Sequence, residues 1–133
     1  GRYGRHLGRL WHAAEDVSVI EHGDAGAHLW ARALAGRPIL AVILAGTRDP
    51  LVGERWAELV LDPRADLADA LHERLVKAGG LALARELIVR ESWSARRALR
   101  VLPDSRYRTA LDRFAADLAR AGFRRSDVSS AES

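Results

Sequence analysis

The feature that most constrains the fold is a helical repeat of apolar residues near the start of the chain. These residues recur at spacings of three and four, which places them along one face of an α-helix: Tyr3, Leu7, Leu10, Ala14 and Val17. Trp11, Glu15 and Val19 form a neighbouring stripe at spacings of four. The repeat predicts a helix over about residues 3–20 that packs through one apolar face.

Further helices are predicted along the rest of the chain, separated by glycine, proline and aspartate. Residues 21–26 are rich in turn-forming residues and are expected to form a loop. The later helices are predicted over residues 27–35 in part, 39–45, 51–61, 66–77, 81–102 and 106–121. We expect Pro38 in the first turn of its helix, the apolar run 39–45 buried on all sides, and Asp66 as a helix cap. After a break at Pro103, a new cap is expected. The predicted fold class is all-α, an antiparallel helical assembly.

Length and composition restrict the class of protein. The 133 residues suffice for about one domain, and the 48% hydrophobic content is compatible with a packed core. Cysteine is absent, which excludes disulfides and thiolate metal sites and fits a cytoplasmic location. The longest apolar run, residues 39–45, is far shorter than the roughly 20 residues that span a bilayer. Because position 1 is Gly, we expect a processed chain or a piece of a longer one.

Four stretches, in order and in spacing, resemble the trans-polyprenyl diphosphate synthases. They are residues 3–8 with Trp11, His12, Glu15 and Asp16; residues 36–44; residues 78–87; and residues 102–105. Together they cover nearly the whole chain. The resemblance implies that residues 1–125 are the C-terminal helices of an isoprenoid synthase fold. Residues 126–133 are polar and lie at the chain end, and we expect them to form a disordered tail. The N-terminal half of such a synthase would then lie on the same chain or on another subunit.

The resemblance also implies a chemistry. Enzymes of this family condense isopentenyl diphosphate with an allylic diphosphate, and Mg²⁺ held by carboxylates neutralises the leaving diphosphate. Glu15 and Asp16 match the first two positions of the family's DDxxD motif and are the expected Mg²⁺ ligands. Val19 occupies the fifth position and cannot ligate a metal. Ala27 stands where the family has a diphosphate-binding lysine.

Other residues are implicated by the same resemblance, although none is assigned as catalytic. The candidates for substrate binding are Trp11, His12, Arg32, Arg37, Arg124 and Arg125. Arg32 and Arg37 would restore positive charge near the diphosphate, and the last two would help to close over the second substrate. Alternative interpretations remain open for all of these groups. The acidic pair could be a salt-bridge site, the tryptophans could be core or interface residues, and the terminal arginines could be solvated.

Two functions follow as hypotheses. The chain is either part of a working prenyltransferase that uses isopentenyl and allylic diphosphates with Mg²⁺, or a catalytically silent homologue or regulatory subunit. In either case we expect a homo- or hetero-oligomer without a membrane span. A remote alternative is a helix-turn-helix DNA reader around residues 79–100, but Glu86 and Glu91 interrupt its basic face. We therefore expect no nucleic-acid partner. Product chain length is not encoded in these residues.

Overall fold

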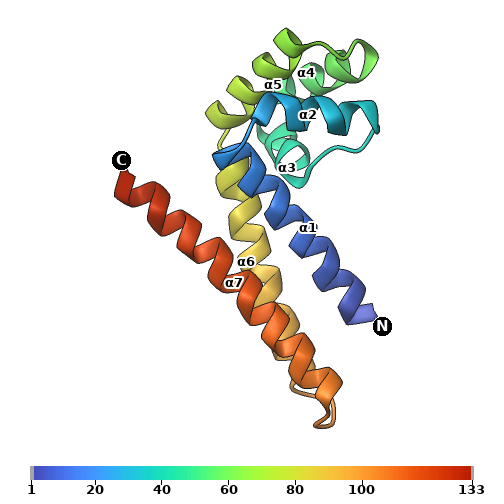
Figure 1. Cartoon of the computed structure of the whole chain (residues 1–133), viewed down its shortest axis with the longest axis vertical. Helices are drawn as coiled ribbons and strands as arrows, with labels where there is room; N and C mark the ends of the chain where they lie inside the picture. Colours follow the sequence, from blue (N-terminus) through green and yellow to red (C-terminus); the bar gives the residue numbers. More distant parts are fainter. Residues whose placement is uncertain (1, 133) are drawn as a thin grey trace. The chain divides into compact units, whose positions relative to one another are not determined.

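The computed structural model describes the backbone of residues 2–132 and the side chains of residues 3–120. Within that part of the chain every regular element is an α-helix (Figure 1). The helices are α1 (Arg2–His22), α2 (Ala25–Leu34), α3 (Leu40–Arg48), α4 (Pro50–Leu61), α5 (Ala65–Lys77), α6 (Gly80–Leu99) and α7 (Arg106–Glu132). The all-α prediction is confirmed. Helix α7 extends to Glu132 rather than ending near residue 121 as expected, so the backbone of residues 126–132 is assigned as helix. The side chains of Arg124 and Arg125 lie outside the described residues, so their expected role stays a prediction.

The chain forms two compact units. The central unit is residues 15–84, and the terminal unit combines residues 1–14 with residues 85–133. Helices α1 and α6 each belong partly to one unit and partly to the other. The two units are described separately below.

Four short helices, α2 to α5, build the core of the central unit (Figure 1). Helix α5 packs against α2, α3 and α4, and its inward side chains are fully buried: Ala68, Leu71 and Leu75. Leu29 from α2 and both Val52 and Leu59 from α4 are also completely buried. These residues follow the three-and-four spacing of the sequence, so one stripe of each helix forms the core.

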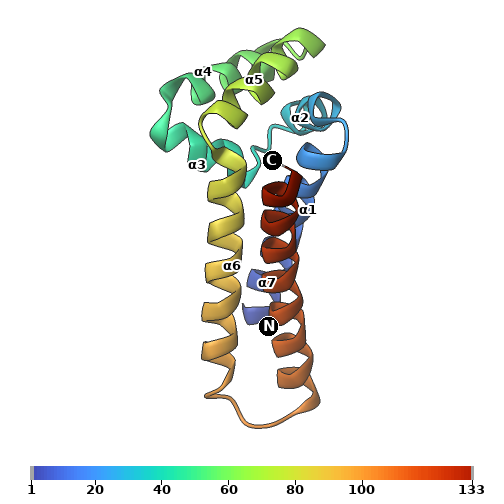
Figure 2. The same ribbon diagram turned by 90° about the vertical axis from the view of Figure 1, so that its left-hand side faces the viewer.

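The terminal unit is built from the start of α1, most of α6, and α7. Helices α6 and α7 run antiparallel and are joined by the turn at residues 100–105 (Figure 2). The buried residues recur along one face of each helix: Leu7 and Leu10; Ile88, Ala95 and Leu99; Leu111, Ala115 and Leu118. The Trp11 ring of α1 lies 5.4 Å from the Phe114 ring of α7, between centroids. This geometry is within the range of favourable aromatic pairs.

Three predicted details of the central unit are wrong. Pro38 precedes its helix, because Ile39 is the N-cap in an extended conformation and α3 begins at Leu40. The run 39–45 is not buried on all sides, since Ile43 is 53% exposed. Asp66 lies in the first turn of α5, whereas the N-cap is Arg64, without a side-chain cap. A first-turn carboxylate still interacts favourably with the helix dipole.

Two helix boundaries also differ from prediction. Only Gly23 and Asp24 interrupt the helices where a loop over 21–26 was expected. Helix α6 ends at Leu99 rather than at 102, because the backbone N–H groups of residues 100–102 donate to carbonyls three residues back, not four. Pro103 follows and has no N–H to continue a helix. The predicted cap after this break is confirmed, since the Ser105 hydroxyl accepts from the Arg108 backbone N–H at 3.1 Å.

Close contact between helices fixes a glycine at the start of α6. A Cβ at Gly80 would lie 2.9 Å from the carbonyl oxygen of Ala41 and 3.0 Å from the Cβ of Ala45, both in α3. The preceding Gly79 ends α5 with a φ of +70°, the left-handed conformation that suits glycine best. The pair Gly79-Gly80 therefore serves two separate purposes, one in the turn and one in packing.

We predict that Gly80→Ala destabilises the protein by about 1–3 kcal/mol, because the added methyl group needs the backbone of α3 to move. Gly53→Ala is the matched control in α4, where a Cβ would meet no atom within 4 Å. It should stabilise the protein by about 0.5–1 kcal/mol through helix propensity. Urea denaturation of both variants measures the difference. Equal effects at the two positions would contradict the close contact.

Asp49 connects three helices of the central unit. Its backbone N–H donates to the carbonyl oxygen of Ala45 near the end of α3. Its carboxylate accepts from the Leu51 N–H at the start of α4, at 3.1 Å. The same carboxylate accepts from the Arg74 Nε of α5 at 2.5 Å. The hydrogen bond from Arg74 is the main reason that the pKa of Asp49 lies below its ordinary value of 3.8, although burial acts in the opposite direction.

This lowered pKa predicts a pH dependence of stability. Because the folded-state pKa is below the unfolded one, the stabilisation by Asp49 is complete well above pH 3.8 and is lost as the pH falls through the folded-state pKa. Asp49→Asn should therefore destabilise the protein at neutral pH, and the difference from the parent should shrink on acidification to about pH 2. Unfolding experiments at both pH values test this expectation.

Asp62→Asn is the control for that series, since the Asp62–Arg64 pair is largely exposed and exposed pairs contribute little. A destabilisation by Asp49→Asn that is the same at both pH values would refute the assigned role of the carboxylate.

Candidate functional site

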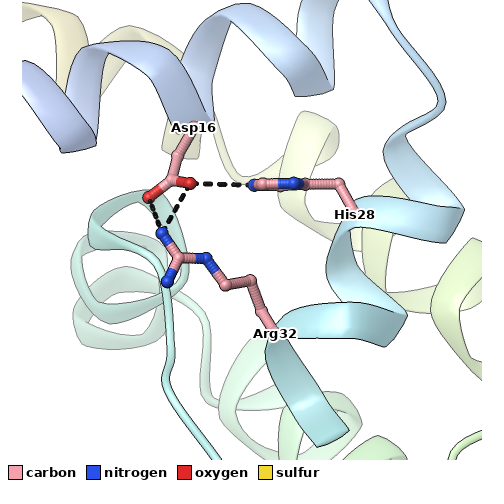
Figure 3. Close-up of polar contacts among 3 residues, drawn as sticks. All are labelled: Asp16, His28 and Arg32. Atoms are coloured by element: carbon pink, nitrogen blue, oxygen red, sulfur yellow. Dashed lines mark hydrogen bonds and ion pairs between the residues drawn. The ribbon is translucent and has the colours of Figure 1, made fainter. Parts of the chain in front are cut away.

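One member of the predicted acidic pair, Asp16, belongs to a partly buried ion cluster in the central unit. Asp16 of α1 is only 8% exposed. Each of its carboxylate oxygens accepts from the Arg32 Nη2 at 2.8 Å, and Oδ1 also lies 2.8 Å from the His28 Nε2 (Figure 3). We call Asp16, His28 and Arg32 the Asp16 cluster.

The local sequence explains how the cluster forms. The Asp24 side chain accepts from the Ala27 N–H and caps α2. His28 and Arg32 are four residues apart in α2 and therefore share a helix face. A Cβ at Gly23 would lie 2.8 Å from the Val19 carbonyl oxygen, so glycine fits the sharp turn between α1 and α2. The two-residue connection Gly23-Asp24 thus brings the face of α2 that carries His28 and Arg32 to Asp16.

The electrostatics of the cluster favour a charged carboxylate. An aspartate removed from water needs a counter-charge and hydrogen bonds to remain ionised. The guanidinium of Arg32 supplies both. Since an ionised carboxylate only accepts hydrogen bonds, the His28 Nε2 is the donor in its contact with Asp16. Both oxygens of Asp16 are therefore occupied by partners from this chain.

The remaining candidate residues do not join this cluster. Glu15 and Arg37 are exposed, and Val19 is 37% exposed. Trp11 packs on Phe114 in the terminal unit, and the exposed His12 belongs to the same unit. Of the residues singled out from sequence, the structure brings Asp16 and Arg32 together. His28 was missed, although its spacing of four from Arg32 across a short turn is a usable signal.

The arrangement bears on the expected Mg²⁺ site. Magnesium needs oxygen ligands with open positions, but both Asp16 oxygens face the Arg32 cation, and the Val19 side chain offers no ligand. Among the described residues, no group of three or more His, Cys, Asp or Glu side chains is placed to hold a metal ion. A divalent cation at Asp16 would have to displace the Arg32 guanidinium. The Mg²⁺ site at Glu15 and Asp16 gains no support here and stays a prediction.

Comparison with known proteins adds no relative: no protein-family model, curated protein or solved structure matches the chain. The resemblance to polyprenyl synthases therefore remains an expectation from sequence. In the described part of the chain, none of the helices is both long enough and apolar enough to cross a membrane.

We predict that Asp16→Asn destabilises the protein by about 1–3 kcal/mol, because it leaves the partly buried Arg32 without its counter-charge. Glu54→Gln, at an exposed position of α4 in the same unit, should change stability by less than about 0.5 kcal/mol. Chemical denaturation measures both variants. The double variant Asp16→Asn/Arg32→Gln should lose less stability than the two single variants together. Equal effects of the two acidic substitutions would show that the cluster is not a stabilising contact.

Proposed function

We propose that this chain is a catalytically silent homologue of the trans-polyprenyl diphosphate synthases that acts through partner binding. The observation that carries the proposal is the Asp16 cluster. The acid that the resemblance assigns to a metal is already paired with Arg32 and His28 of the same chain. A carboxylate in this arrangement stabilises the fold and is not open to a metal–diphosphate complex.

The chemistry of prenyl transfer needs more than one such group. Ionisation of an allylic diphosphate places negative charge on the leaving diphosphate, and cations must neutralise that charge in the transition state. Two carboxylates at positions i and i+4 of a helix would face one metal, but Val19 stands four residues after Glu15. Ala27 provides no amine at the position where the resemblance expects a lysine. The absence of both groups supports a non-catalytic role.

Exposed apolar side chains of the central unit support partner binding. Trp30 and Leu34 are 43% and 65% exposed, and their spacing of four places them on one face of α2. Exposed apolar groups of this size that share a face are typical of protein–protein contacts. The partner implied by the resemblance is a synthase subunit or the N-terminal half that these helices would complete.

A working prenyltransferase remains the second candidate, and one observation favours it. Glu15, at the first position of the motif, is exposed and could approach a metal that another part of the enzyme holds. In that case the Asp16 cluster would position Glu15 rather than bind the metal itself.

The two candidates predict different outcomes in one assay. The intact protein, with any residues that precede Gly1, is incubated with radiolabelled isopentenyl diphosphate, an allylic diphosphate and Mg²⁺. We expect no labelled product, because position 27 has no lysine to neutralise the leaving diphosphate and position 19 has no carboxylate to hold a Mg²⁺ that would do so. We also expect no increase in melting temperature with Mg²⁺ and inorganic diphosphate, since a ligand that binds the folded state would raise it.

Circular dichroism shows whether the assayed protein is folded. Robust product formation would overturn the proposal and establish the prenyltransferase alternative. Val19→Asp/Ala27→Lys is an informative variant, because it adds the two missing groups. A gain of Mg²⁺-dependent thermal stabilisation in this variant alone would support the assignment of the two positions.

A further inference from the structure

The two units carry opposite net charge. Residues 3–14 and 85–120 of the terminal unit contain eleven arginines and five acidic residues, a surplus of six positive charges. Residues 15–84 of the central unit contain seven basic and eleven acidic residues, a surplus of four negative charges. The small net charge of the whole chain, +3, hides this separation. An anionic partner is therefore attracted to the terminal unit in particular.

The positive charge is concentrated around the turn between α6 and α7. Two adjoining clefts meet there and share Asp104 and Thr109. One of them, of about 300 Å³, is lined by three arginines, and the other is lined by two more. We call these five residues the arginine-rich turn: Arg96, Arg100, Arg106, Arg108 and Arg113.

Only part of this charge is neutralised within the unit. Arg96 pairs with Asp112 at 3.1 Å, and Arg108 pairs with Asp104 at 2.8 Å. The other three arginines are exposed, and none of them makes a side-chain ion pair or hydrogen bond with the described residues 3–120: Arg100, Arg106 and Arg113. Three positive charges thus face solvent near the turn that joins α6 to α7, and Figure 2 shows this turn at one end of the helix pair.

Apolar and aromatic side chains accompany these arginines. Val101, in the turn itself, is 84% exposed, and Tyr107 is 54% exposed. Trp93 is also half-exposed, and the Arg96 guanidinium lies 4.9 Å from its ring centroid. Exposed aliphatic and aromatic groups surrounded by arginines are suited to the headgroup region of a bilayer, where apolar tips insert and basic groups meet phosphates.

From these observations we propose that the arginine-rich turn docks the protein on an anionic phospholipid surface. The three unpaired arginines contact lipid phosphates, and the Val101 side chain enters the interface between headgroups and acyl chains. A duplex nucleic acid would use the arginines in a similar way, but it offers no apolar region for an exposed valine. A lipid surface accounts for both the unpaired arginines and the exposed Val101. This inference is independent of whether the chain is catalytic.

Vesicle co-sedimentation of the full chain tests the proposal. We expect binding to phosphatidylcholine vesicles that contain phosphatidylglycerol, little binding to pure phosphatidylcholine, and a decrease with added salt. Each arginine removed from the turn should weaken binding about fivefold, as expected for basic residues near an anionic surface. Arg100→Gln/Arg106→Gln is the test variant. Val101→Ser should weaken binding without changing its dependence on salt.

Arg37→Gln/Arg48→Gln is the matched control, because it removes the same charge from exposed positions of the central unit. It should bind vesicles like the parent. Circular dichroism confirms that each variant folds. Equal binding to neutral and anionic vesicles, or equal loss in the test and control variants, would overturn the proposal. Duplex DNA that binds the turn and displaces the vesicles would assign the surface to nucleic acid instead.

Discussion

A buried carboxylate that must be paired is the constraint on which the central unit depends. Asp16 lies in a largely apolar stretch of α1 between residues that pack inward, and it is almost inaccessible to water. The energetic cost of an isolated charge in such a place is several kcal/mol or more. Arg32 and His28 offset that cost, because only two residues separate α1 from α2 and α2 presents both side chains on one face. The cluster thereby sets the position of α2 against the end of α1.

The same pairing has a consequence for function. A carboxylate that is held by a guanidinium has little affinity left for a metal, since the cation would have to displace a charged hydrogen-bond donor. Both Asp16 oxygens are already engaged by side chains of the same chain. Val19 and Ala27 also lack the charged groups that the resemblance leads us to expect at their positions.

The two units also differ in how far their charged side chains are paired. In the central unit arginine and aspartate mostly pair locally, as in the Asp49–Arg74 contact between helices. In the terminal unit arginines exceed acidic residues, and several of those at the α6–α7 turn are left to solvent. Local pairing favours a stable fold, whereas unpaired like charges near one turn repel one another. An external anionic surface relieves that repulsion, which is why the turn is a candidate for binding.

The sequence by itself determined the helical class and most helix positions. Apolar residues at spacings of three and four indicate which face a helix buries, and Leu7, Leu10 and Val17 are buried as their spacing predicts. Capping details at Pro38 and Asp66 were predicted wrongly, because several neighbouring residues satisfy the same local preference. Only the tertiary structure decided which residue of the acidic pair is buried and paired with cations. Spacing within α1 makes Glu15 and Asp16 equivalent neighbours, and spacing within α2 places His28 and Arg32 on one face. Which of the two acids is buried and meets that face depends on how α2 packs against the end of α1.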